Sequence, residues 1–492
     1  MPTPNILLIH ADQHRQDCLG CYGNTQIKTP AIDALASDGV RYDNSFCPYA
    51  MCTPSRYSLL SGLYVNQHLG KTNRCTLPEG LPTFPKMLRE HGWHTACVGK
   101  MHFTPTYLDV GFNQMALCEQ VGPGRLDDDF HRELKRDGLF DWVDSIDQMR
   151  AHRGNAPSFY FEACGALESD LPEERHSTRW IGDRACEILG QWQGGGNLLM
   201  AGFVKPHHPF DPPYPYSEMY KPGDIALLPG YTESPLERDM QVSSFYPSEN
   251  LTKTAIQRCQ AMYYGTISHI DTQVERMMEL LRRKGLYDDC LIIYTSDHGE
   301  YMGYHHMVGK ANYLYEPLAR VPLVVKYPGG ANAGGMSEQM VNNVDVAAMI
   351  LAQAGLEKTK AMTGYDFSVP GSDAAYIFAD DRFGYMARSR RYKLLYCGTR
   401  ESLFFDLEND PHELVNLYSD PAHTAQVETH KNALADWILF GCPRPVNLND
   451  NAPARAPNAR GANTSHREDM QAFFARGVAQ VPGKYTSEGS QF

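Results

Sequence analysis

The chain has 492 residues, 42% of them apolar and 11% aromatic, enough for one large domain with a smaller one or for two to three ordinary domains. Its formal net charge is −13, so a nucleic-acid partner, which calls for a basic surface, is not expected. No apolar run reaches the roughly 18 residues that a membrane-spanning helix needs. An acidic chain can still bind an anion where Lys, Arg, His or a metal ion gather locally.

The N-terminal stretch MPTPNILLIHADQ predicts a core strand, because it has neither a basic region nor a small-residue cleavage site. A cytoplasmic location is therefore expected. The 13 cysteines show no framework spacing, which fits a reducing compartment. Cys18 and Cys21 have CxxC spacing, but no second pair follows, so a zinc site is not predicted.

Strand-like and helix-like segments alternate over the first 370 or so residues. The apolar runs that indicate buried strands are 5–11, 95–99, 198–204, 290–296 and 321–327. Segments 29–39, 83–92 and about 252–285 have the spacing or the end signals of helices. The alternation predicts an α/β fold with a mostly parallel sheet sandwiched by helices, in a catalytic domain over residues 1–372.

The pattern changes after about residue 370. Segments in which apolar and polar residues alternate indicate antiparallel strands, and the spacing of apolar residues in 422–441 predicts a helix. Residues 373–442 are thus predicted to form a smaller C-terminal α+β subdomain with an antiparallel sheet. The remainder, 443–492, is predicted to be an irregular arm with one short helix near 470–477. Its apolar rings suggest packing on a neighbouring subunit, hence a homo-oligomer, or folding back on its own domain.

Polar side chains follow four of the buried strands. In open α/β sheets ligands bind outside the carboxyl ends of the strands, which here share one edge. The residues at these ends and in the loop after the fourth strand are Asp12, Gln13, Lys100, His102, Lys205, His207, His208, Asp297, His298 and Lys310. Each alone has an ordinary explanation as a cap, turn or satisfied polar group. Four strand ends of this kind at one edge favour a functional site.

Asp12, Gln13, Asp297 and His298 offer two carboxylates, an amide oxygen and an imidazole, a set that suits a divalent cation. The oxygens favour Ca²⁺ or Mg²⁺, and the imidazole adds weight to Mn²⁺. The basic residues near this set are Arg56, Lys100, Lys310 and, with less weight, Lys205. A metal ringed by such residues requires an anion between them, so the constellation predicts a tetrahedral oxyanion ligand, sulfate or phosphate.

Cys52 precedes Thr53-Pro54-Ser55-Arg56 and an apolar helical run that ends at Gly62. This places the thiol at a helix N-terminus, where the helix dipole favours an anion and lowers a thiol pKa. Arg56 follows one turn later on the same face. A buried cysteine that merely begins a helix is the alternative.

The motif Cys-Thr-Pro-Ser-Arg at 52–56 resembles the signature of type I sulfatases, members of the alkaline-phosphatase-like superfamily. NILLIHADQ, VGKMHF, FVKPHHPF, TSDHGEYMG and FFDLENDPHELVNL resemble further family segments in the family's order, over about residues 4–420. The resemblance implies that a formylglycine-generating enzyme oxidises Cys52 to formylglycine, so the working group is not a thiol.

The resemblance also assigns roles to individual residues. The implied metal ligands are Asp12, Gln13, Asp297, His298 and the modified Cys52. Lys100, Arg56 and Lys310 are implied to stabilise the transferring group, His207 or Lys310 to protonate the leaving alcohol, Asp297 to accept the proton of the nucleophile, and His102 to release sulfate from the hydrated aldehyde. Ca²⁺ is the usual metal of the family, with Mn²⁺ as the alternative.

The predicted function is hydrolysis of a small anionic sulfate monoester to an alcohol and sulfate. Many sulfatases carry Asp at the position of Gln13 and Asn at that of His298; the residues found here are similar to phosphonate monoester hydrolases and choline-sulfatases. A phosphonate monoester or phosphodiester hydrolase is therefore the alternative. A second alternative is a non-catalytic anion-binding protein that keeps the Cys52 thiol. Aryl, sugar and choline esters all remain open as substrates.

Overall fold

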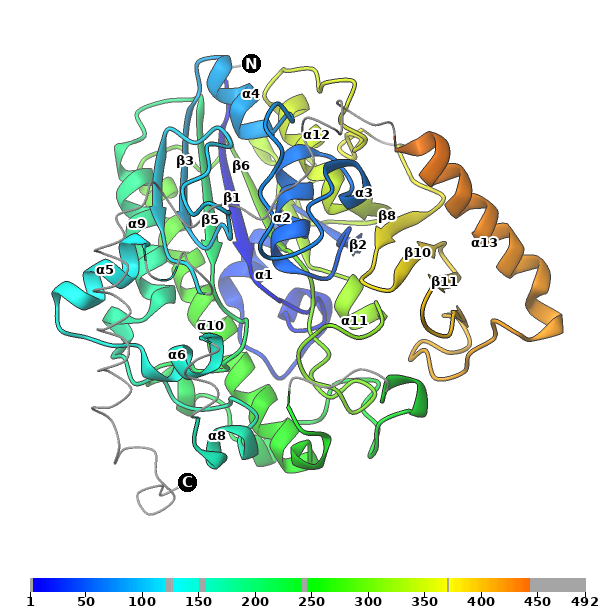
Figure 1. The fold of residues 1–492 in the computed structure, drawn as a ribbon. Helices are drawn as coiled ribbons and strands as arrows, with labels where there is room; N and C mark the ends of the chain where they lie inside the picture. The colour runs from blue at the N-terminus through cyan, green and yellow to red at the C-terminus, as the bar shows by residue number, and fades with distance from the viewer. Residues whose placement is uncertain are drawn as a thin grey trace.

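The computed structural model describes residues 3–120, 125, 127–149, 156–240, 246–369 and 371–442. An eight-stranded sheet in the order β4-β3-β5-β1-β6-β7-β2-β8 forms its centre (Figure 1). Its strands are β1 (Asn5–Ala11), β2 (Val40–Phe46), β3 (His94–Gly99), β4 (Gln114–Leu117), β5 (Asn197–Phe203), β6 (Cys290–Ser296), β7 (Leu323–Lys326) and β8 (Gly335–Asn342). Only β7 runs against the others within the described chain, so the predicted mostly parallel sheet is confirmed.

The α-helices described before residue 372 are α1 (Pro30–Ser37), α2 (Cys52–Ser61), α3 (Val65–His68), α4 (Phe84–Glu90), α5 (Asp129–Arg136), α6 (Trp142–Gln148), α8 (Ser158–Glu162), α9 (Ser177–Gln191), α10 (Lys253–Arg283), α11 (Glu316–Ala319) and α12 (Asn343–Gln353). No helix within the described ranges is long and apolar enough to cross a bilayer.

The central strand β1 shows why helices cover both faces of the sheet. Successive side chains of a strand point to opposite faces. Leu7 and Ile9 pack in one core cluster with residues of α1, α9 and α10. Ile6 and Leu8 pack in a second cluster with residues of α2, α4 and α12. A strand buried on both faces must be apolar throughout, which explains the continuous apolar runs of the sequence.

A second sheet of four antiparallel strands lies in the C-terminal region, in the order β12-β11-β10-β9 (Figure 1). Its strands are β9 (Ile377–Asp380), β10 (Gly384–Arg388), β11 (Tyr392–Cys397) and β12 (Leu403–Asp406). One face packs against α13 (Thr424–Asp436), and the other contacts the loop after β6 through Met386 and Phe405. The predicted antiparallel sheet is confirmed. The arm 443–492, its short helix and its proposed role in a homo-oligomer lie outside the described residues.

Two of the predicted helices are shorter in the structure. The segment 29–39 forms α1 over Pro30–Ser37, and 83–92 forms α4 over Phe84–Glu90. The segment 422–441 also divides, because α13 ends at Asp436 and Trp437–Gly441 continues as a π-helical turn. The strands β2, β4 and β8 have few consecutive apolar residues, which is why the sequence pattern did not reveal them.

Candidate active site

The parallel strands β1, β3, β5 and β6 bring their carboxyl ends to one edge of the sheet. β1 pairs with β5 on one side and with β6 on the other, so residues after these three strands become neighbours. Asp12 follows β1, Lys100 follows β3, His207 lies beyond β5, and Asp297 follows β6. All four side chains are buried. The topology thus gathers the sequence-predicted residues as expected for an α/β sheet.

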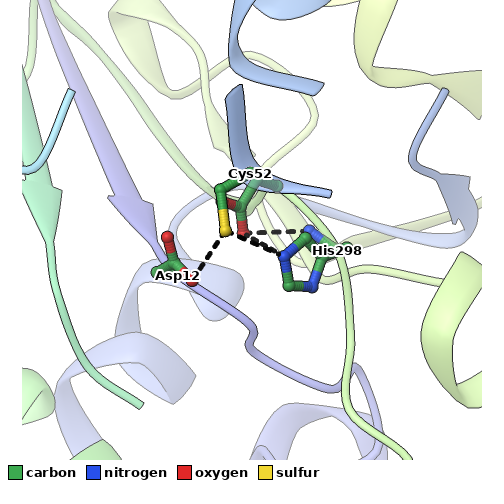
Figure 2. Close-up of side chains that lie close together, drawn as sticks. Asp12, Cys52 and His298 are labelled. Atoms are coloured by element: carbon green, nitrogen blue, oxygen red, sulfur yellow. Dashed lines mark hydrogen bonds and ion pairs between the residues drawn. The ribbon is translucent and has the colours of Figure 1, made fainter. Parts of the chain in front are cut away.

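Four side chains converge on one point at this edge. One ligand atom each from Asp12, Cys52, Asp297 and His298 lies within 4.8 Å of the others, and all four residues are buried. Figure 2 shows the Cys52 thiol between Asp12 and His298. The Cys52 Sγ lies 3.7 Å from Oδ1 of Asp12 and 3.4 Å from Nε2 of His298. Two carboxylates, an imidazole and residue 52 fit a single divalent cation.

Gln13 adds an oxygen to this set. Its backbone N–H donates to Oδ1 of Asp297 at 2.9 Å, which places the residue beside the cluster. Its Oε1 is buried and has no hydrogen-bond partner within the described part of the chain. A buried polar atom without a partner is costly, and a bound cation would satisfy it. Gln13 also has a φ of 63°, and such left-handed backbone outside glycine is concentrated at functional sites.

Glu300 orients the Gln13 amide, a role that the sequence pattern did not reveal. Gln13 Nε2 donates to Oε2 of Glu300, while Oε1 of Glu300 accepts from the backbone N–H groups of Met302 and Gly309. A carboxylate can only accept hydrogen bonds, so the amide nitrogen must face Glu300. The amide oxygen is left for the cation. Glu300 is the last residue of the DHGE segment after β6. An acidic residue at the start of a loop is common as a capping residue, so nothing in the sequence pointed to this role.

We expect Glu300→Gln to weaken binding of the divalent cation by about 10- to 100-fold, the usual range for residues that orient metal ligands. The new amide keeps its oxygen toward the two backbone N–H groups and turns its nitrogen toward Gln13. Gln13 must then turn its own nitrogen toward the cation. Calorimetric titration with Ca²⁺ and Mn²⁺ measures the change, with the exposed Glu357→Gln as control. Equal affinity in both variants contradicts the role of Glu300.

His298 is held in one orientation. Its Nδ1 lies 2.9 Å from the carbonyl oxygen of Gly299, so the Nδ1–H donates there and Nε2 faces the cluster. Metal-binding histidines are commonly fixed in this way through the other ring nitrogen. The orientation supports His298 as a ligand.

Arg56 joins the two carboxylates of the cluster. Its Nη2 lies 2.8 Å from Asp12 Oδ2 and its Nε lies 3.0 Å from Asp297 Oδ2, and all three side chains are almost fully buried. Its Nη1 donates to the carbonyl oxygen of Lys100. Arg56 therefore fixes the positions of Asp12 and Asp297, the two carboxylates that could hold a cation. Helix α2 begins at Cys52, as predicted, and ends at Gly62, whose φ of 63° suits glycine.

Lys100 and Asp12 form a buried ion pair. The Lys100 Nζ lies 2.9 Å from Oδ2 of Asp12 and 3.1 Å from Oε1 of Gln120, which leaves one N–H of the ammonium for a ligand. Burial opposes ionisation of Asp12, but Lys100 and the other nearby cations hold its pKa well below the usual value. Burial also disfavours the ammonium, yet Asp12 raises the pKa of Lys100. Both groups are thus charged at neutral pH.

Lys310 contacts the cluster and is only partly buried, unlike the four cluster residues. Its Nζ is 3.0 Å from Sγ of Cys52 and 2.9 Å from Nε2 of His298. Burial and Asp12 oppose a thiolate, but Lys310 and Lys100 hold the pKa of Cys52 well below the usual value. The site is therefore built to stabilise negative charge at position 52.

His207 and the turn that carries His102 flank the cluster. The His207 Nε2 lies 4.0 Å from Oδ1 of Asp12, and its Nδ1 lies 2.6 Å from the carbonyl oxygen of His208. Burial and His208 lower the pKa of His207 well below the usual value. His102 has a φ of 58°, and its carbonyl oxygen accepts from the Thr53 hydroxyl at 3.0 Å, which ties this turn to α2. The structure thus gathers most of the predicted residues at this edge of the sheet: Asp12, Gln13, Cys52, Arg56, Lys100, His207, Asp297, His298 and Lys310, with His102 on the adjoining turn.

Lys205 belongs to a separate buried network, although its position after β5 suggested a contribution to the anion site. Its Nζ contacts Asp144 at 3.3 Å and also Asp211, so its charge is neutralised there. Gln120 connects the two regions, because it accepts from Lys100 and donates to Asp144 at 3.0 Å. Gln120 follows the short strand β4, so the strand-end rule would have found it had β4 been recognised.

Comparison with known proteins places this geometry in a family. The Sulfatase family model matches residues 4–356. The chain therefore belongs to the Sulfatase family. The membership makes it a sulfuric ester hydrolase, as the sequence motif indicated.

The chain is also similar to individual proteins and to a solved structure. The arylsulfatase of Clostridium perfringens is 27% identical over 86% of this chain and 92% of its own length. The multifunctional alkaline phosphatase superfamily protein PehA of Trinickia caryophylli is 29% identical over 91% and 97%. The crystal structure of the phosphonate monoester hydrolase of Agrobacterium radiobacter superposes with a TM-score of 0.76 at 24% identity, covering 92% of this chain and all of that one. The alkaline-phosphatase-like fold is thereby confirmed.

Proposed function

We propose that the protein hydrolyses sulfate monoesters to an alcohol and inorganic sulfate, with formylglycine formed from Cys52 as the nucleophile and one divalent cation as cofactor. The observation that carries the proposal is the convergence of Cys52, at the start of α2, with Asp12, Asp297 and His298. A thiol at this point would be one ligand among several. An oxygen nucleophile there would lie beside the cation and beside Lys310.

Asp12, Gln13, Asp297, His298 and residue 52 would hold the cation. When bound, it would act as a Lewis acid that favours the ionised nucleophile and stabilises charge on the sulfuryl group. Family resemblance favours Ca²⁺, and the imidazole of His298 keeps Mn²⁺ as the alternative. Because Gln13 is a neutral amide, its set with Asp12 and Asp297 carries one negative charge less than a set of three carboxylates would.

Formylglycine, once hydrated, supplies one hydroxyl to attack sulfur and a second whose deprotonation expels sulfate and regenerates the aldehyde. Asp297 lies within the cluster and accepts the first proton. His102, on the turn tied to α2, accepts the second. The Lys100 ammonium binds a sulfuryl oxygen with its remaining N–H.

The leaving oxygen needs a proton donor, and Lys310 is better placed than His207. Its ammonium lies next to position 52, with Nζ 3.0 Å from Sγ of Cys52, so it carries protons at the point where the ester oxygen would leave. His207 directs Nδ1 at a backbone carbonyl, which leaves Nε2 without a proton in the neutral ring. Lys310 therefore donates to the leaving oxygen, with His207 as the alternative donor.

The second candidate function is hydrolysis of phosphonate monoesters or phosphodiesters. The similarity of the fold to a phosphonate monoester hydrolase and the presence of Gln13 favour it. These substrates carry one negative charge, as sulfate monoesters do, so charge does not separate them. They differ in having a carbon substituent where a sulfate monoester has a bare oxygen. Lys100 is buried and paired with Asp12 at the point where that oxygen would lie.

We expect higher kcat/KM for sulfate monoesters than for phosphonate monoesters or phosphodiesters. Lys100→Ala should lower sulfatase kcat/KM by about 10²- to 10³-fold, the usual effect of removing one charge-stabilising donor, and diesterase activity far less. Lys71→Ala, at a half-exposed lysine, is the control. Steady-state kinetics on the three ester classes measure the effect. Equal losses on all classes, or a wild-type preference for the phosphonate, would assign the protein to the rival function.

Three further parts of the proposal rest on the sequence. A formylglycine-generating enzyme is the maturation partner that the motif at 52–56 requires. The cytoplasm is the proposed compartment. A homo-oligomer formed through the arm 443–492 is proposed from the apolar rings of that segment.

A further inference from the structure

Gln120 lies shortly after β4 and contacts the Lys100 ammonium. Its side-chain Oε1 lies 3.1 Å from Nζ of Lys100, and the residue is buried. The strand β4 is the last strand at one side of the sheet and pairs in parallel with β3, which Lys100 follows. Gln120 therefore reaches the site from the strand beside the one that positions Lys100.

The Gln120 amide can adopt only one orientation. Its Nε2 donates to Oδ1 of Asp144 at 3.0 Å and to the carbonyl oxygen of His208 at 2.9 Å. Burial opposes ionisation of Asp144, but Arg125 holds the pKa of this carboxyl below the usual value. Carboxylate and carbonyl oxygens only accept hydrogen bonds, so both must face the amide nitrogen. The amide oxygen is therefore directed at the Lys100 ammonium, which only donates.

The backbone around this contact is held separately from the Gln120 side chain. Oε1 of Glu119 accepts from the backbone N–H groups of Met101 at 3.1 Å and of His102 at 2.8 Å, which fixes the turn after β3. The carbonyl oxygen of Gln120 accepts from Nη1 of Arg125 at 3.0 Å. Since Glu119 holds the turn, the Gln120 amide is left to act on the ammonium.

The ammonium needs this second acceptor because a lysine side chain is flexible and carries three N–H donors. Oδ2 of Asp12 lies 2.9 Å from Nζ of Lys100 and takes one donor. With Asp12 alone, the other two N–H groups could rotate about that hydrogen bond. Oε1 of Gln120 takes the second donor and thereby fixes the direction of the third. The third N–H is the one that binds a sulfuryl oxygen in the proposed reaction.

The same amide ties Lys100 to the loop that carries His207. The carbonyl oxygen of His208, which accepts from Nε2 of Gln120, also lies 2.6 Å from Nδ1 of His207. The strand β5 precedes this loop and pairs with β3 on the side opposite to β4. One glutamine thus connects the carboxyl ends of three neighbouring strands, so the direction of the ammonium is set relative to both flanking loops.

We propose that Gln120 is a positioning residue for ester hydrolysis, which holds the Lys100 ammonium so that its remaining N–H meets a sulfuryl oxygen of the substrate. The inference rests on the proposed function, because the task of Lys100 belongs to that reaction. Gln120 acts through Lys100 and does not bind the substrate, since both N–H groups of its amide are used within the protein.

Gln120→Met tests this role, because methionine is similar in volume and cannot accept a strong hydrogen bond from the ammonium. We expect kcat/KM to fall about 10- to 100-fold, as misdirection of a group that contacts the substrate predicts. The substrate is whichever of 4-nitrophenyl sulfate, choline sulfate and glucose 6-sulfate the wild type hydrolyses fastest. Gln193→Met, at an exposed glutamine, is the matched control and should keep wild-type kinetics.

The outcomes separate this proposal from the proposed function. Unchanged kcat/KM in folded Gln120→Met overturns the positioning role and leaves the sulfatase intact. No turnover of any of the three esters by the mature wild type overturns the proposed function, and the role of Gln120 with it.

The Lys100→Ala background distinguishes positioning from general damage to the fold. If Gln120 acts through Lys100, Gln120→Met should lower kcat/KM by no more than about twofold in that background, because the two effects are not additive. The same fold loss in both backgrounds overturns the proposal. Gln120→Asn, whose amide is one methylene shorter, gives the same comparison with a polar side chain if Gln120→Met does not fold.

A crystal structure of the mature wild type with inorganic sulfate gives a measurement that needs no variant. We expect a sulfate oxygen within hydrogen-bond distance of Nζ of Lys100, while Nζ stays within hydrogen-bond distance of Oε1 of Gln120. A Lys100 that turns away from Gln120, or that carries no sulfate, overturns the proposal.

Discussion

Cys52→Ala should abolish turnover, whereas Cys47→Ala should leave it intact. Loss of a nucleophile that acts together with its partners costs at least about 10⁴-fold in kcat. The thiol of Cys52 lies between Asp12, His298 and Lys310. Cys47 is buried five positions earlier in the chain, and its thiol contacts only the carbonyl oxygen of Leu318 among the contacts described. Steady-state kinetics on a sulfate monoester compare the two variants.

Mass spectrometry of the active wild-type enzyme provides the chemical control. Tryptic cleavage after Arg41 and Arg56 releases one peptide that carries both cysteines. After alkylation, residue 47 should carry the thiol label, and residue 52 should carry an aldehyde. Fully active enzyme with thiols at both positions would falsify the formylglycine mechanism.

Asp12→Asn should lose both the cation and activity, with kcat/KM lower by at least about 10³-fold, because it removes a charged ligand from the site. The carboxylate also neutralises Lys100 at 2.9 Å and Arg56 at 2.8 Å, so its loss leaves buried positive charge uncompensated. We therefore expect a lower melting temperature as well. Elemental analysis, kinetics and calorimetry measure the three effects.

Asp109→Asn is the matched control for this experiment. Asp109 pairs with Arg89 on the surface, where its side chain is 67% exposed, and such pairs contribute little to stability. The control should retain cation, activity and melting temperature. A metal-free Asp12→Asn enzyme with full activity would contradict the proposed cofactor.

The sequence allowed the strands to be predicted wherever a strand is buried on both of its faces. β1, β5 and β6 are continuous apolar runs because helices cover both sides, and such runs stand out in any sequence. The short strand β4 was not accessible, because its exposed and half-buried positions at the sheet edge tolerate polar residues. Missing β4 also meant missing Gln120 beside Lys100.

The sequence allowed site residues to be predicted where they directly follow strands or lie together in a short motif. Asp12, Lys100 and Asp297 follow parallel strands, and the rule for strand ends predicts their convergence. Glu300 was not accessible, because its role depends on facing Gln13 from 287 positions away in the chain. The motif at 52–56 predicted that Arg56 belongs to the site, but only the structure shows that it contacts Asp12 and Asp297.

The sequence by itself determined the chemistry of this protein: the motif at 52–56, the strand-end ligands and the alternation of strands and helices define the reaction class and the sheet. Those features are local, and spacing along the chain expresses them directly. The tertiary structure decided the orientation of the Gln13 amide and that of the Gln120 amide beside Lys100. Both depend on contacts between segments far apart in sequence, the second through Asp144 and the carbonyl oxygen of His208. Such contacts leave no periodic trace in the chain.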